Sequence, residues 1–101
     1  MGFKLFVDDT RDRPKGFEYA QTYAESISLY IAFGEFDFVD LDYDLNEKYS
    51  GLDILIWMKK NGKHPKHINI HSNHIEGMNL MRHYAEENFP GTRVTMVTLD
   101  K

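Results

Sequence analysis

The stretch "DFVDLDYDL", residues 37–45, decides how the rest of the chain is interpreted. Asp40, Asp42 and Asp44 alternate with Leu41, Tyr43 and Leu45, and a period of two predicts a strand with one polar face. Taken alone, the pattern needs no function, because a strand that faces water on one side carries polar residues there. The alternative is that the carboxylates gather where a cation or a phosphate binds.

The flanking sequence predicts strands that alternate with helices. Apolar runs predict strands near residues 3–7, 19–22, 38–42, 67–71 and 93–99. Helices are predicted between Thr22 and Gly34, between Ser50 and Gly62, and from about Glu76 to Asn88. Thr22 begins a Thr-x-x-Glu capping box with Glu25. This order predicts a single α/β domain, residues 1–101, with a five-stranded parallel sheet in a three-layer, flavodoxin-like fold.

Composition limits the class of protein. The 101 residues include no cysteine, so disulfides and thiolate metal sites are excluded. The net charge of -4 disfavours electrostatic binding along an extended nucleic-acid backbone. Binding of a small phosphorylated ligand or of one RNA end remains compatible with this charge. The sequence shows no signal peptide, membrane span or complete myristoylation signal, and we expect a cytoplasmic protein.

Parallel strands end along one edge of their sheet, and that edge is where doubly wound folds bind ligands. Asp8 and Asp9 follow the first predicted strand, Asp42 ends the third, and His71 with Ser72 ends the fourth. Acids that merely face solvent have no reason to fall at the same end of different strands. The sequence therefore favours a functional role for Asp42, whereas Asp37 and Asp40 are interpreted as surface or strand-start residues.

Several motifs resemble one family over nearly the whole chain. The segments "VDDTRDRPKG", "LDYDL", "SGLDILIWM" and "IHSNHIEGMNLM" are similar to cyclic-phosphate processing receiver domains, which are related to response-regulator receivers. The family's third-strand motif is usually Asp-His-Asp, and Tyr43 takes the middle place here. Its fourth-strand motif is usually His-Ser-x-Asn-Pro, whereas His74 and Ile75 replace the Asn and Pro. The resemblance implies a receiver-like fold and cyclic-phosphate chemistry.

The candidate site follows from the chemistry of these residue types. Clustered carboxylates repel one another unless a cation lies among them, and oxygen ligands suit Mg²⁺ or Mn²⁺. The candidate metal ligands are Asp8, Asp9 and Asp42 with Asp44 in support, the candidate phosphate contacts are Arg11, Ser72 and Asn73, and the candidate acid–base residues are His71 and His74.

Most of these residues also have a purely structural interpretation. His71 is equally compatible with a hydrogen-bonded position on a sheet face, and Asn73 with a turn or a helix cap. Arg11 and Arg13 are also expected to pair with Asp9 and Asp12. The remaining polar and aromatic candidates are expected to be surface residues, namely His64, His67 and His83, or a packing residue, namely Trp57.

The function expected from the sequence is metal-dependent hydrolysis of a cyclic phosphate on a nucleotide or an RNA end. Two other classes stay open: a signalling receiver that accepts a phosphoryl group on Asp42, and a noncatalytic module that binds a cyclic nucleotide or a protein. Against the receiver, the lysine that receivers carry at the end of the fifth strand is absent, since only Lys101 follows "VTMVTLD". No room exists for a helix between Asp9 and Tyr19 either.

Overall fold

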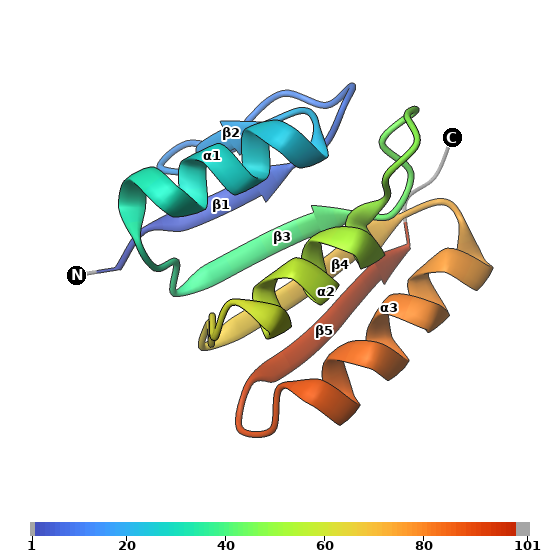
Figure 1. The fold of residues 1–101 in the computed structure, drawn as a ribbon. Coiled ribbons are helices and arrows are strands. Elements are labelled where there is room, and N and C mark those ends of the chain that lie inside the picture. The colour runs from blue at the N-terminus through green and yellow to red at the C-terminus, as the bar shows by residue number, and fades with distance from the viewer. Residues whose placement is uncertain (1, 99–101) are drawn as a thin grey trace.

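The computed structural model describes residues 2–98, which form one parallel sheet with three helices. The strands are β1 (Lys4–Val7), β2 (Glu18–Ala20), β3 (Phe38–Asp42), β4 (His67–Ser72) and β5 (Arg93–Thr98). Their order in the sheet is β2-β1-β3-β4-β5, and all neighbouring pairs are parallel (Figure 1). After β1 the chain adds β2 on one side of β1, and it then returns to add β3, β4 and β5 on the other side. The switch point of the sheet therefore lies between the carboxyl ends of β1 and β3.

The helices are α1 (Tyr23–Phe33), α2 (Gly51–Lys60) and α3 (Ile75–Asn88), and caps define their first turns. The Thr22 side chain accepts from the Glu25 backbone N–H, as the predicted capping box requires, but the Glu25 carboxylate accepts from Gln21 N instead of Thr22 N. Ser50 and Asp53 form a complete capping box on α2. Such local signals lie within four residues of each other, which explains why the sequence alone located these helices.

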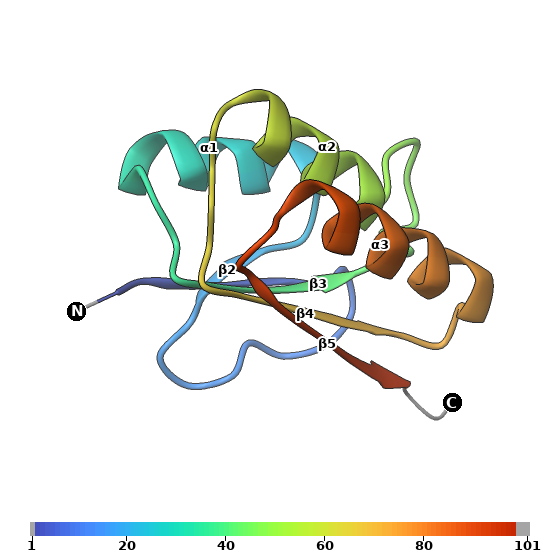
Figure 2. The same cartoon turned by 90° about the horizontal axis from the view of Figure 1, so that it is seen from below.

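The sheet carries helices on one face only within residues 2–98 (Figure 2). The predicted α/β fold with five parallel strands is confirmed. The structure differs from a three-layer arrangement because the loop between β1 and β2 covers part of the second face in place of a helix. Phe17 of this loop packs edge-on against Phe6 and Phe38 of the sheet.

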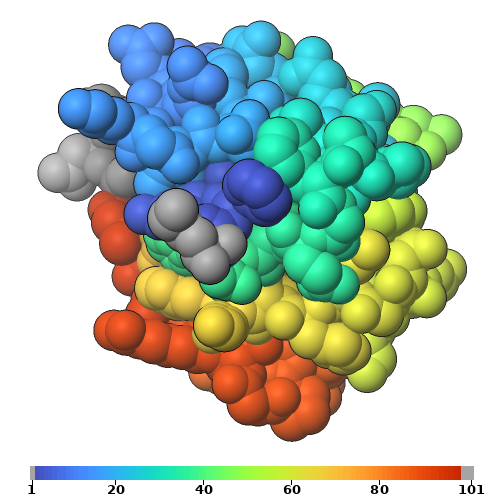
Figure 3. All heavy atoms as spheres, turned by 90° about the vertical axis from the view of Figure 1, so that its left-hand side faces the viewer, coloured from blue at the N-terminus to red at the C-terminus, as the bar shows by residue number. Residues whose placement is uncertain are grey.

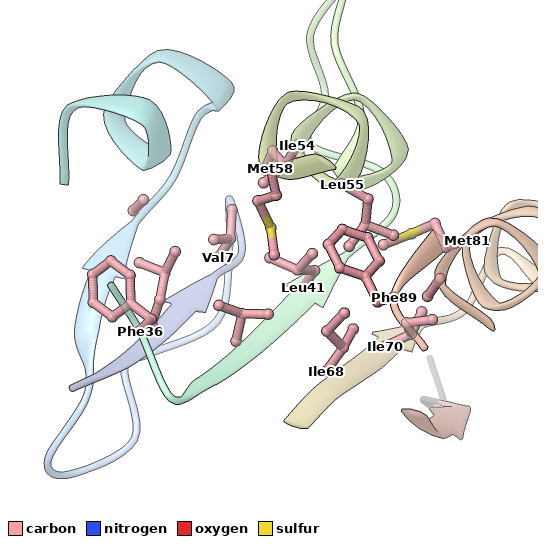
Figure 4. Close-up of a cluster of buried hydrophobic side chains, with 14 of the residues drawn as sticks. Val7, Phe36, Leu41, Ile54, Leu55, Met58, Ile68, Ile70, Met81 and Phe89 are labelled. Carbon is pink, nitrogen blue, oxygen red and sulfur yellow. The ribbon is translucent and has the colours of Figure 1, made fainter. Parts of the chain in front are cut away.

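The hydrophobic core lies between the sheet and the three helices. Val7, Leu41, Ile68 and Ile70 point from the strands toward α2 and α3, where Ile54, Leu55, Met58, Met81 and Phe89 meet them (Figure 4). All nine side chains are buried. Trp57 is partly buried and packs against Tyr30, so its predicted packing role is confirmed.

The two edges of the sheet differ. At the edge where the strands begin, the N-terminal segment and the turns that follow the helices pack side by side (Figure 3). The loops after β1, β3 and β4 lie at the opposite edge, where the strands end (Figure 1). Within residues 2–98, none of the helices has the length and apolar composition of a membrane span.

Candidate functional site at the carboxyl edge of the sheet

Asp8 follows β1 directly and is completely buried. Its Oδ1 accepts hydrogen bonds from the backbone N–H groups of Thr10 and Arg11, both at 2.9 Å. Burial alone would raise the pKa of Asp8, but these backbone donors and the neighbouring His71 outweigh it and lower the pKa. Asp8 is therefore a carboxylate at neutral pH, and its position is fixed by the turn that it closes.

Asp42 ends β3 and lies next to Asp8 across the switch point. Burial raises the pKa of Asp42 to about 6; the charge of Asp8 adds to this, while His71 and the Ser72 hydroxyl oppose it. The Asp42 Oδ1 also accepts from Asp44 N at 3.3 Å. The Asp42 carboxylate can therefore accept further hydrogen bonds or bind a cation. Its ionised form is energetically unfavourable in this buried position unless a cation lies nearby.

His71 lies in β4 between two carboxylates and is only 4% exposed. Its Nδ1 lies 2.6 Å from Asp40 Oδ1, and its Nε2 lies 2.8 Å from Asp8 Oδ2. Burial would lower the pKa of His71, but the hydrogen bonds to Asp40 and Asp8 and the charges of Asp40 and Asp42 raise it instead. The ring also stacks on Phe6 with a centroid distance of 5.0 Å. Both ring nitrogens are therefore engaged.

Asp8, Asp42 and His71 form a cluster whose potential ligand atoms all lie within 4.8 Å of one another. Two carboxylates and one imidazole are a donor set that accepts a divalent ion such as Mn²⁺, and oxygen-rich sites also bind Mg²⁺. A metal ion on His71 Nε2 must displace the proton that this nitrogen shares with Asp8. The structure thus brings two of the three predicted ligands together and adds His71, whereas Asp9 lies beside the cluster.

A cavity of about 290 Å³ opens next to the cluster at the carboxyl edge. It is lined by Asp9, Thr10, Arg11, Asp42, Asp44, Asn46 and Asn73. Burial and the charges of Asp8 and Asp44 raise the pKa of Asp9. Five of the predicted site residues therefore share one cavity, whose wall carries three carboxyl groups and a single guanidinium.

Arg11 and Ser72 have protein partners. The Arg11 Nε lies 3.7 Å from Asp8 Oδ2, so Asp8 is its partner in place of the expected Asp9. The Arg11 side chain is still 46% exposed, which leaves guanidinium donors free for a ligand. Ser72 is buried, accepts from His74 N at 3.1 Å and does not line the cavity. The Ser72 hydroxyl also hydrogen-bonds Asp42, so a contact with a bound phosphate would require the hydroxyl hydrogen to leave that carboxylate.

His74 is the N-cap of α3. Its Nδ1 accepts from the Gly77 N–H at 2.9 Å, and its ring stacks on Tyr43 at 4.8 Å between centroids. Gly77 has no room for a side chain, since an added Cβ would lie 2.3 Å from the Tyr43 ring. Because Nδ1 accepts, the neutral ring carries its hydrogen on Nε2. The helix cap that the sequence allowed for Asn73 is thus one residue later.

Asp40 and His67 are the residues that the sequence misjudged. Asp40 was expected at the surface, but it accepts from His71 and also from Asn69 Nδ2 at 3.0 Å. His67 is half-buried in β4 and stacks on Phe38. Their alternation with buried apolar residues is a signal that they share one face with His71, but a single sequence does not show their partners.

The parallel sheet with acidic residues and a histidine at its carboxyl edge defines the protein as a receiver-like α/β domain. Comparison with protein families is more specific. The model of the family described as the cyclic-phosphate processing receiver domain matches residues 3–87, and the chain belongs to this family. The search of curated proteins and the search of solved structures each returned no match.

Proposed function

We propose that the protein hydrolyses a cyclic phosphate on a nucleotide or an RNA end with the help of Mg²⁺ or Mn²⁺. The observation that carries this proposal is the convergence of Asp8, Asp42 and His71 beside an open cavity in a chain of this family. The cavity volume of about 290 Å³ is at the lower end for small-ligand sites, which favours a mononucleotide or a chain end over a longer strand.

The charge of the cavity supports a metal ion. Asp9, Asp42 and Asp44 line the same cavity as Arg11, so a phosphate anion would meet mostly like charges. Asp8 and Asp42 are the residues that would hold the ion, with Asp9 and Asp44 close to it, so Nε2 of His71 stays available beside them for proton transfer. When bound, a divalent ion supplies positive charge that neutralises the carboxylates and the phosphate. Arg11 and Asn73 are placed to donate hydrogen bonds to phosphate oxygens.

Hydrolysis requires two proton transfers. A water oxygen bonds to phosphorus, the bond between phosphorus and one sugar oxygen breaks, a base removes a water proton, and the freed sugar oxygen takes up a proton. We assign proton transfer to Nε2 of His71, the ring nitrogen that faces Asp8. His74 can only donate from Nε2 while its Nδ1 caps α3, so its role is that of an acid or a hydrogen-bond donor.

The test is to incubate the metal-loaded protein with 2′,3′-cyclic mononucleotides, 3′,5′-cyclic nucleotides and acetyl phosphate, and to follow each by phosphorus NMR. We expect metal-dependent conversion of a cyclic phosphate to a monoester, and His71→Ala should reduce it about 10²- to 10⁴-fold. His83→Ala is the matched control, because His83 is exposed on α3 and is not among the cavity residues.

Three outcomes separate the classes of function. Metal-dependent hydrolysis that is lost in His71→Ala supports the proposal. Tight binding of a cyclic nucleotide without turnover favours a noncatalytic binding module. Phosphorylation of Asp42 by acetyl phosphate, without hydrolysis of any cyclic phosphate, favours a signalling receiver and would replace the proposed reaction.

A further inference from the structure

The face of the sheet without helices carries a row of hydrogen-bonded polar side chains. Three residues of β4 alternate in this row with one residue of β5 and one of β3, in the order His67, Thr95, Asn69, Asp40 and His71. Its distances are short: 2.7 Å from His67 Nε2 to Thr95 Oγ1, 2.6 Å from Thr95 Oγ1 to Asn69 Oδ1, and 3.0 Å from Asn69 Nδ2 to Asp40 Oδ1. The row ends at the Asp40–His71 contact of 2.6 Å.

The donor directions in this row follow from the chemistry of its members. The Thr95 hydroxyl donates its only hydrogen to Asn69 Oδ1, so it accepts from His67 Nε2–H. With its oxygen engaged in this way, Asn69 turns its amide nitrogen to Asp40. An ionised carboxylate only accepts hydrogen bonds. Asp40 is thus the common acceptor at the end of the row.

The same reasoning fixes the His71 ring. Because Asp40 accepts, His71 Nδ1 must carry the hydrogen of their contact. Phe6 holds the plane of the ring, with an angle of 6° between the two rings, and Asp8 lies at the other nitrogen. Asp8 is a carboxylate too, so in the metal-free protein Nε2 carries the hydrogen of its contact with Asp8, and Nε2 is the ring nitrogen that faces the carboxylate cluster.

We propose that Asp40 is a positioning residue that keeps Nδ1 of His71 protonated and thereby directs Nε2 to Asp8 and Asp42. This inference rests on the proposed function, in which Nε2 is the nitrogen that moves a proton. A carboxylate on the far nitrogen of a histidine sets its tautomer and orientation and increases its basicity, and loss of such a partner reduces activity or metal affinity about 10- to 100-fold. Asp40 itself does not line the cavity.

The experiment compares three residues at position 40. Asp40→Asn retains an acceptor oxygen without the charge, and Asp40→Leu removes the acceptor at similar size. The first readout is the protonation of each His71 nitrogen, measured by long-range ¹H–¹⁵N correlation on histidine-labelled protein with and without Mg²⁺. The second readout is kcat and KM for the cyclic phosphate that the wild type hydrolyses. Asp37→Asn, a neighbouring acid just before β3, is the matched control.

We expect a protonated Nδ1 in the wild type and in Asp37→Asn, and a weakened Nδ1–H contact in Asp40→Asn. In Asp40→Leu we expect an Nδ1 that has lost its hydrogen, while Nε2–H still contacts Asp8. The value of kcat should fall from the wild type to Asp40→Asn and further to Asp40→Leu, where the loss should be about 10- to 100-fold. KM should change little. A bare Nδ1 in the wild type would overturn the inference, and so would a loss of kcat in Asp40→Leu with an unchanged tautomer.

The two readouts keep this inference separable from the reaction. If the wild type hydrolyses nothing, the proposed function fails, and the His71 tautomer in the wild type and in Asp40→Asn still decides the role of Asp40. If Asp40→Leu does not fold, the same two proteins suffice, because a bare Nδ1 in the wild type contradicts the inference without any third variant.

Discussion

The two faces of the sheet use the same strands for different purposes. On the helix-covered face, Leu41 and Ile70 are completely buried among apolar side chains. On the other face, Asp40 and His71, their immediate neighbours in sequence, are joined by a hydrogen bond. Apolar burial stabilises the fold without directional requirements, whereas each polar group on the second face needs a partner in a specific place.

This difference separates stability from function along one strand. Successive residues of β4 alternate between the faces, so a substitution at Ile70 affects the core and a substitution at His71 affects the site. We therefore expect the two faces to respond differently to mutation, and the predictions below begin with the largest expected effect.

Ile70→Ala should reduce the free energy of unfolding by about 2–5 kcal/mol, because it leaves a cavity in the core. Thr95→Val, on the polar face of β5, removes one donor at nearly constant volume and should cost about 1 kcal/mol. Urea denaturation of both variants measures the difference. Equal losses would contradict the division of the sheet into a stabilising face and a polar face.

The second prediction concerns the carboxylates beside the polar face. Mn²⁺ or Mg²⁺ should raise the melting temperature, since a ligand at about 100 times its Kd stabilises the native state by about 2.7 kcal/mol. Asp42→Asn should abolish this rise, whereas Asp12→Asn, an exposed acid of the β1–β2 loop, should retain it. Thermal unfolding followed by circular dichroism is sufficient. An unchanged wild-type curve at millimolar metal would refute the metal site.

How far the sequence could predict this molecule depends on the range of the interactions. Strand β3 was predicted with its observed bounds because alternation is a property of neighbouring residues. The carboxyl edge was also predictable, because parallel strands place Asp8, Asp42 and His71 at one end whatever their sequence separation.

The contacts within the site were not predictable in the same way. Asp40 lies 31 residues and Asp8 lies 63 residues from His71 in sequence, and many registers of the sheet would have left these side chains apart. A residue such as Asp40 looks like a solvent-facing acid until the partner strand is known. Pairing across strands is therefore the information that the sequence lacked.

The third prediction is a dependence of stability on pH in the metal-free protein. The pKa values of Asp42, about 6, and of His71 are both raised in the folded state. The folded state thus binds more protons than the unfolded state from about pH 4 upward, and stability should fall as the pH rises through these values. The loss due to Asp42 should be on the order of 1–2 kcal/mol, since cavity solvent screens part of the charge.

Asp42→Asn provides the control for this slope. The variant should be more stable than the metal-free wild type at pH 7, and its stability should change less between pH 4 and pH 6, because the carboxyl group with the raised pKa is gone. Denaturant titrations at a series of pH values measure both quantities. A wild type that becomes more stable from pH 4 to pH 7 would contradict the sign that we derive.

The smallest expected effect concerns His74, which lies where the edge of the sheet meets α3. Its Nδ1 caps the helix through Gly77 N–H, so His74→Ala should cost about 1 kcal/mol of stability, whereas His74→Asn should restore most of it, because Asn is a good N-cap. Urea denaturation measures the stability, and turnover of the cyclic phosphate measures the chemistry. If His74 acts only as a cap, the Asn variant retains full turnover; if its Nε2–H takes part in the reaction, both variants lose turnover equally while only Ala loses stability. The two substitutions at His74 thus separate its role as the N-cap of α3 from a role in the reaction.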